Sequence, residues 1–281
     1  MASDTSIILV TGGTGTLGRL VVPLLREAGR EVRVLSRHGR PTGRAGAAGA
    51  DGVDHVAVDL LDGEGIGPAL EGLGTVVHLA GGPKGDDVAT RNLVRAARSA
   101  DVRHFVLISV IGADRVPLAW LRSKLAAERA VAESGLPWTT LRAAQFHELT
   151  LKTVRAMAKS PVFPVPGGLR LQPVDARDVA ARIAELALGG PSGLVPDLAG
   201  PEVYGLGDLA RGYLKASGKR RPTMPVRIPG KAGRAYRAGD NLTLDGADTG
   251  KRTWEDFLAE HVGGDGSPAS RTAQGPGRRS I

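Results

Sequence analysis

A glycine-rich turn near the start of the chain has the residue types and spacing of a phosphate-binding loop. It reads Thr11-Gly12-Gly13-Thr14-Gly15-Thr16-Leu17-Gly18 and follows an apolar run at residues 7–10. We expect Gly13 to permit a tight turn, Gly15 to let the backbone approach a pyrophosphate, and Gly18 to let the next helix pack close to the strand. The N-terminus of that helix would present N–H groups and its positive dipole end to the phosphates.

Two other interpretations compete at this turn. A loop of the P-loop type needs Lys and then Ser or Thr after the last glycine, whereas Arg19 and Leu20 stand there. The other alternative is a glycine-rich connection between a strand and a helix that binds nothing. The strand before the turn and the helix after it favour dinucleotide binding over both.

The end of the second apolar run, at residues 32–35, indicates which dinucleotide binds. A site selective for NAD needs a carboxylate about 20 residues after the glycines, to accept from the ribose 2′-hydroxyl. Ser36 and Arg37 stand here instead, with Arg40 close behind. A hydroxyl and a guanidinium group suit a 2′-phosphate, so the sequence predicts NADP(H) in preference to NAD(H). A solvated basic loop is the alternative.

Two further strand ends complete the predicted cofactor site. Asp59, beside Leu60, is placed to accept from an adenine amino group, and its alternative role is that of a turn or cap residue. Ala80, Gly81 and Gly82 are small enough for a ribose to lie against their backbone. The residues predicted here to bind the cofactor are Gly12, Gly13, Thr14, Gly15, Thr16, Leu17, Gly18, Ser36, Arg37, Asp59, Leu60, Ala80, Gly81 and Gly82.

Alternating strands and helices must position these residues. Near-continuous runs of Val, Ile and Leu predict strands that are buried on both faces, as in a parallel sheet. The predicted strands are residues 7–10, 32–35, 55–58, 76–79, 105–109 and 138–141, and the helices between them are 16–28, 87–100 and 118–134. This alternation predicts the fold class α/β, with a doubly wound parallel-sheet Rossmann domain.

The pattern changes after about residue 145. Helical segments are predicted at residues 148–159, 175–188 and 206–217, between connections rich in Pro and Gly. We expect an NAD(P)-binding domain at residues 1–145 and a small C-terminal α/β substrate-binding cap at 146–262. Residues 263–281 are rich in Gly, Ser, Pro and Arg, which predicts a disordered tail. A loop is expected over residues 39–52.

Composition excludes several classes of protein. The 281 residues include no Cys, so disulfides and thiolate chemistry are excluded, and no His–carboxylate spacing indicates a metal site. No apolar run could span a bilayer and no secretory signal is evident, so we expect a cytoplasmic protein with no membrane partner. Nine basic and no acidic residues fall within 209–239, and the rest of the chain holds 28 basic against 29 acidic residues. The charge of +8 is therefore local.

Taken together, these motifs resemble the atypical, NmrA-like branch of the short-chain dehydrogenase/reductase superfamily. The resemblance covers residues 7–260 and implies an NADP-binding Rossmann domain with oxidoreductase or redox-sensing function. The residues that carry it are the turn 11–18, Ser36-Arg37, Asp59-Leu60, residues 78–81, and the runs 108–128, 141–147 and 173–180.

The resemblance also implies a catalytic set. Members of the superfamily with a YxxxK pair use Tyr as the proton donor, Lys to bind the nicotinamide ribose, and an upstream Ser to polarise the substrate carbonyl. Lys124 and Ser109 match two of these positions, but Trp120 stands where the Tyr is expected. An indole cannot act as an acid or base near neutral pH. Lys124 is thus expected to bind the ribose even where the proton donor is missing.

His147 follows the sixth predicted strand and is a candidate replacement for the proton donor, since its reference pKa is about 6.5. Packing beside the cofactor is the alternative role for this side chain. A quinone-like acceptor would tolerate Trp120 better than a simple ketone, and the indole could stack on a flat substrate.

Three functions remain open from the sequence. The first is an NADP(H)-dependent oxidoreductase acting on a small carbonyl or quinone-like substrate, and the alternative is a non-catalytic, redox-sensing regulator. Binding of nucleic acid through the basic stretch 211–237 ranks last, because that stretch carries no recognised nucleic-acid motif. The sequence does not indicate an oligomeric state.

Overall fold

The structure is a computed structural model that describes residues 7–37, 52–82 and 84–262. The tail expected over residues 263–281 and all but Gly52 of the loop expected over residues 39–52 lie outside the described residues. Arg40 lies there too.

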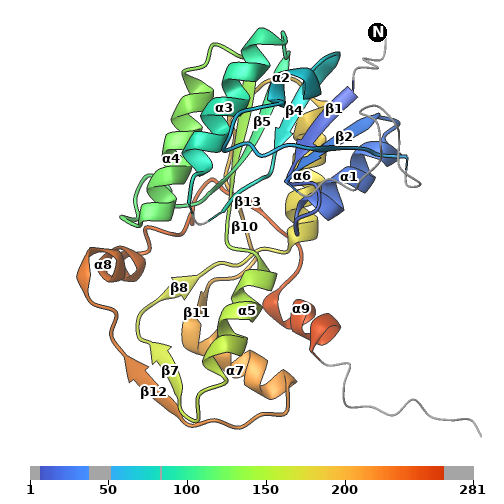
Figure 1. The fold of residues 1–281 in the computed structure, drawn as a ribbon. Coiled ribbons are helices and arrows are strands. Elements are labelled where there is room, and N and C mark those ends of the chain that lie inside the picture. Colours follow the sequence, from blue (N-terminus) through green and yellow to red (C-terminus); the bar gives the residue numbers. More distant parts are fainter. Residues whose placement is uncertain (1–6, 38–51, 83, 263–281) are drawn as a thin grey trace, which may run out of the picture.

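A parallel sheet forms the centre of the molecule (Figure 1). Its strands follow the order β13-β10-β6-β5-β4-β1-β2-β3, and β9 pairs with β6 off this path. β4 is buried at all six positions, as a strand covered on both faces must be. The strands are β1 (Ile7–Thr11), β2 (Val32–Ser36), β3 (Asp54–Ala57), β4 (Leu73–His78), β5 (His104–Val110), β6 (Trp138–Ala143), β9 (Gly193–Leu194), β10 (Leu198–Ala199) and β13 (Asp248–Thr249).

Helices cover both faces of this sheet. One face packs against α1 (Gly18–Glu27) and α6 (Ala176–Leu188), and the other against α2 (Ile66–Ala69), α3 (Asp86–Ser99) and α4 (Ala119–Ala132) (Figure 1). The three layers and the central order β3-β2-β1-β4-β5-β6 confirm the predicted doubly wound Rossmann fold.

A second, smaller lobe lies below the carboxyl ends of the strands in Figure 1. Its apolar core is built around Phe163, Tyr213, Trp254 and Phe257. The elements of this lobe are α5 (His147–Met157), β7 (Phe163–Pro166), β8 (Arg170–Leu171), β11 (Tyr204–Gly205), α7 (Leu206–Ala216), β12 (Thr223–Val226), α8 (Gly230–Ala238) and α9 (Trp254–His261).

The chain returns from this lobe to the main sheet more than once. α6 packs beside α1, and β9, β10 and β13 extend the sheet beyond β6. The sequence placed a domain boundary after residue 145. Residues 176–199 and 248–249 lie beyond that boundary but pack on or extend the sheet. The predicted helices and the first six strands are present within a few residues of their expected bounds, whereas α2, α8, α9 and the short strands were not predicted.

Three glycines of the turn after β1 lack room for a side chain. Gly12 has a φ of +69°, and a Cβ there would lie 2.7 Å from the backbone nitrogen of Ala80. A Cβ on Gly13 would lie 2.7 Å from the Val34 side chain, and one on Gly18 would lie 2.3 Å from the carbonyl oxygen of Gly12. The tight turn thus depends on Gly12 and not on Gly13 as predicted, while Gly18 lets α1 pack close, as predicted.

We expect Gly18→Ala to lower the free energy of unfolding by about 1–3 kcal/mol, because a methyl group at this position overlaps backbone atoms that cannot move independently. Urea unfolding followed by circular dichroism measures the effect. Gly67→Ala in α2 is the matched control, since a Cβ there meets nothing within 4 Å. That variant should be neutral or slightly stabilising, and an equal loss in both variants would contradict the close packing at Gly18.

Candidate functional site

A cleft of about 370 Å³ opens at the carboxyl ends of β1, β2, β3 and β4. β1 lies between β2 and β4 in the sheet, with Val10 paired to Val34 on one side and to Val77 on the other. The strand order reverses here, and in open α/β sheets this is where ligands bind. The lining includes ten of the predicted cofactor residues: Gly12, Thr14, Gly15, Ser36, Arg37, Asp59, Leu60, Ala80, Gly81 and Gly82.

The remaining predicted residues surround the cleft without lining it. Gly13, Leu17 and Gly18 are buried behind the turn, and Thr16 is exposed just before α1 begins. Lys124 reaches Gly81 from α4, because a Cβ on Gly81 would lie 2.9 Å from the Lys124 Nζ. The lining also includes Lys84 and Asp86, which the sequence did not single out.

Ser36 provides a test of whether a dinucleotide fits this cleft. Its Oγ is buried and has no hydrogen-bond partner among the described residues. A buried hydroxyl that lines a cleft is accounted for by a ligand that bonds to it. The exposed Arg37 lies beside it in the lining. The pair thus suits the adenosine ribose and its phosphate, and the residues present fit an NAD(P) cofactor.

Asp59 forms a turn at the end of β3. Its Oδ1 accepts a hydrogen bond from the backbone N–H of Leu61 at 2.9 Å. The turn role that the sequence left as an alternative is therefore present, and the residue also lines the cleft.

A buried histidine ties the two central strands to α3. His78 Nδ1 lies 2.7 Å from Thr11 Oγ1, and His78 Nε2 lies 3.0 Å from Thr90 Oγ1. Thr90 donates its own proton to the carbonyl oxygen of Asp86, so Nε2–H must be the donor to Thr90 and Nδ1 the acceptor from Thr11. Burial, together with the charge of Lys124, lowers the pKa of His78 to about 3. His78 is thus a neutral, buried structural residue that precedes the cleft residues Leu79 and Ala80.

Lys124 is paired with an acidic residue at the start of α3. Its Nζ lies 2.9 Å from Asp86 Oδ2, and Asp86 Oδ1 accepts from the backbone N–H of Gly82 at 2.7 Å. Both side chains are largely buried. The predicted ribose-binding lysine is therefore held at the edge of the cleft by a carboxylate.

Ser109 does not have the free hydroxyl that carbonyl polarisation requires. It donates a hydrogen bond of 2.5 Å to Glu128 Oε1, which also accepts from Arg142 Nε at 2.9 Å. Arg142 reaches Glu128 Oε2 at 2.7 Å as well, and these hydrogen bonds raise the pKa of Arg142. Because a hydroxyl carries one proton, Ser109 cannot donate to a substrate while it donates to Glu128.

Trp120 shares a helix face with Lys124 and Glu128, at intervals of four residues along α4. Trp120 is 37% exposed, whereas Lys124 pairs with Asp86 of α3 and Glu128 pairs with Arg142 of β6. α4 starts just beyond the carboxyl end of β5, so Trp120 lies at the same edge of the sheet as the cleft.

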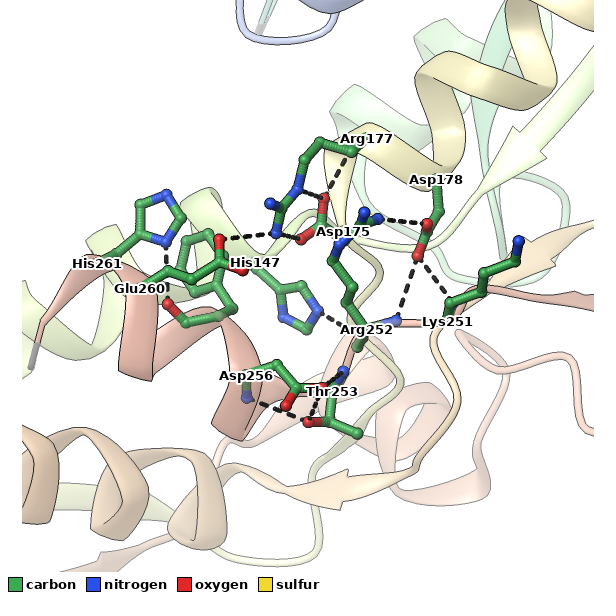
Figure 2. Close-up of polar contacts among 11 residues, drawn as sticks. His147, Asp175, Arg177, Asp178, Lys251, Arg252, Thr253, Asp256, Glu260 and His261 are labelled. Carbon is green, nitrogen blue, oxygen red and sulfur yellow. Dashed lines mark hydrogen bonds and ion pairs between the residues drawn. The ribbon is translucent and has the colours of Figure 1, made fainter.

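His147 is a packing residue in the small lobe, which does not fit the predicted role of proton donor. The side chain is 0% exposed and stacks on Phe257 and Trp254, with ring centroids 5.1 and 5.7 Å away. Its Nε2 lies 3.3 Å from the carbonyl oxygen of Arg252 (Figure 2). Burial lowers its pKa from the ordinary value and favours the neutral form. His147 does not line the cleft.

Ion pairs hold α9 over this histidine (Figure 2). Arg177 bridges Asp175 and Glu260 at 2.7 and 2.9 Å, and Arg252 donates to Asp178 at 2.8 Å. Asp175 is the N-cap of α6 and accepts from the backbone N–H of Arg177. Figure 2 thus shows a structural junction between α6 and α9 rather than a second reactive site.

The described part of the chain has neither a metal-binding cluster nor a membrane-spanning helix. No group of three His, Cys, Asp or Glu side chains there could hold a metal ion, and none of its helices has the length and apolar character to cross a bilayer. The lining of the cleft contains none of the nine basic residues of the stretch 211–237.

Comparison with known proteins places the chain in a family. The family model described as NAD(P)H-binding matches residues 12–188. An NAD(P)H azoreductase from Xenophilus azovorans is 31% identical over 228 residues, which covers 79% of this chain and 77% of that protein. Quinone oxidoreductase 2 from Escherichia coli is 28% identical over 217 residues, or 76% of each chain.

Solved structures share the fold. An NADPH-dependent quinone oxidoreductase from Escherichia coli in complex with NADPH has a TM-score of 0.76 at 23% identity, covering 90% of this chain and 99% of that one. The Citrobacter triphenylmethane reductase in complex with NADP(H) has a TM-score of 0.66 at 23% identity, covering 91% and 95%. The chain belongs to the NAD(P)H-binding family, and its structural neighbours share the fold that the resemblance predicted.

Proposed function

We propose that the protein is an NADP(H)-dependent oxidoreductase that passes a hydride to a quinone-like, conjugated acceptor. The proposal rests on Trp120 and Ser109, which stand where the superfamily has its proton donor and its carbonyl-polarising hydroxyl. Trp120 replaces the acid, and Ser109 gives its only proton to Glu128. The cofactor cleft is retained beside a site that lacks both expected groups.

The chemistry of the acceptor explains why such a site suits a quinone. Reduction of a simple ketone places a negative charge on one oxygen, which must be protonated or strongly stabilised in the transition state. A conjugated acceptor spreads that charge over its ring system and takes a proton from water afterwards. The exposed Trp120 offers a flat surface on which such a ring can stack.

The residues of the cleft have distinct roles in this proposal. Gly12 and Gly15 let the backbone and the N-terminus of α1 meet the pyrophosphate, and Lys124 holds the nicotinamide ribose. When bound, the cofactor supplies the hydride. Ser36 and Arg37 would contact the 2′-phosphate, which is the basis for proposing NADP(H) over NAD(H).

The acceptor would enter between the sheet and the small lobe. We assign substrate contacts to the lobe elements between α5 and α8, since the carboxyl edge of the sheet faces them (Figure 1). Relatives named for azo, quinone and triphenylmethane reduction support a conjugated acceptor. A non-catalytic redox sensor would share the cleft but would not turn over.

Turnover distinguishes an enzyme from a sensor. We expect NADPH oxidation, followed at 340 nm, with several quinones and little or none with simple ketones. Lys124→Met should reduce kcat/KM with the best quinone by about ten- to a hundredfold, because it removes a charged ribose contact. Tight NADPH binding by the wild-type protein without turnover on any quinone would favour the sensor instead.

Restoring the acid should broaden the range of acceptors. Trp120→Tyr recreates the YxxxK spacing with Lys124, so we expect measurable ketone reduction that the wild-type protein lacks. Trp120→Phe is the matched control, since it keeps an aromatic ring but no hydroxyl. Equal ketone reduction by both variants would show that position 120 does not face the reacting carbonyl.

Cofactor choice is tested at Arg37. Arg37→Ala should weaken NADPH binding by about ten- to a hundredfold and NADH binding by less than about threefold, because only NADPH carries the 2′-phosphate. Arg98→Ala is the control, as Arg98 is exposed in the last turn of α3 and does not line the cleft. Fluorescence titration of the wild-type protein and both variants with each cofactor gives the six dissociation constants. Equal losses for NADPH and NADH would remove Arg37 from the 2′-phosphate site.

A further inference from the structure

Asp86 is a buried acid at the edge of the cleft for which the sequence gave no role. It is 6% exposed, lines the cleft, and is the first residue of α3. A buried carboxylate is costly unless its oxygens are satisfied. Here one oxygen accepts from the Gly82 backbone N–H and the other lies 2.9 Å from Lys124 Nζ.

These contacts fix Lys124 in one place. The lysine comes from α4, Asp86 from α3, and Gly82 from the connection after β4. Gly81 has no side chain to separate them, since a Cβ there would lie 2.9 Å from Lys124 Nζ and 3.5 Å from Asp86 Oδ2. Three separate elements thus meet around one ammonium group. The charge of that group extends to His78, where it helps to lower the pKa.

We propose that Asp86 is a positioning residue that holds the Lys124 ammonium against Gly81 and balances its charge beside the cofactor. This inference rests on the proposed function, because it assumes that the nicotinamide ribose lies at Lys124. An uncompensated lysine there would oppose the positive charge that the nicotinamide ring gains when the hydride leaves. The negative charge of Asp86 offsets most of the repulsion between Lys124 and the oxidised nicotinamide ring. NADP⁺ and NADPH therefore bind with similar strength.

The neighbouring acid does not have the same role. Asp87 accepts from Ser123 Oγ at 2.9 Å and from Arg91 at 2.7 Å, and it does not line the cleft. It joins α3 to α4 through Ser123, whereas the carboxylate that pairs with Lys124 is that of Asp86. Asp87 therefore provides a matched control of equal charge, one residue away.

The test is the ratio of the dissociation constants of NADP⁺ and NADPH, each measured by isothermal titration. Asp86→Asn keeps a carbonyl oxygen for the Gly82 N–H but loses the charge. We expect it to raise the ratio about three- to tenfold, because Lys124 then disfavours the positively charged ring. Asp86→Glu retains the charge and should stay within about twofold of the wild-type ratio. Asp87→Asn should leave the ratio unchanged.

A double variant shows whether Asp86 acts through Lys124. In a Lys124→Met background, Asp86→Asn should no longer raise the ratio, since the charge to be balanced is gone. Equal weakening of both cofactor forms by Asp86→Asn, or a persistent rise in the double variant, would overturn the charge-balancing role through Lys124 while leaving the proposed function intact. If wild-type protein binds neither form, both proposals fail.

Discussion

The close approach of α1 to the carboxyl ends of β1 and β4 is the constraint on which the rest of the structure depends. Side chains at Gly12 and Gly18 would overlap backbone atoms, so their absence brings the helix N-terminus to the point where the sheet order reverses. The neutral His78 of β4 hydrogen-bonds to Thr11 of β1 and to Thr90 of α3, and so joins the two central strands to that helix. A cleft that suits a pyrophosphate follows from this packing.

Two buried ion pairs hold the charged side chains at or beside the predicted residues Lys124 and Ser109, and they leave fewer groups free to exchange a proton. Lys124 is matched by Asp86, and Arg142 is matched by Glu128, which also takes the Ser109 proton. Buried pairs of this kind are costly to break, because removing one partner strands the other charge. Of the groups predicted to assist catalysis, Lys124 and Ser109 are therefore both held by carboxylates in the described structure. An acceptor that needs no acid from the protein is the one that such a site can serve.

Local patterns predicted the sheet and most residues that line the cleft, because strand, glycine turn and helix are contiguous in sequence. Ser36 and Arg37 could be placed at the cleft because a strand end in this order has a fixed place beside β1, and their contact with a 2′-phosphate stays a prediction. Asp86 was missed, since its pairing with Lys124 depends on how α3 packs against α4. The choice between the two roles left open for His147 could not be made from sequence for the same reason: nothing near it in sequence shows that α9 packs on its ring. Contacts between segments that are distant in sequence could therefore not be predicted.

A crystal structure with NADPH bound tests the central claim most directly. The account predicts the pyrophosphate over the backbone of Gly12 to Gly15, the 2′-phosphate at Ser36 and Arg37, and the nicotinamide ribose within hydrogen-bond distance of Lys124 Nζ. The exposed face of the nicotinamide ring should then open toward Trp120. A cofactor bound elsewhere, or one whose ribose lies away from Lys124, would contradict the account.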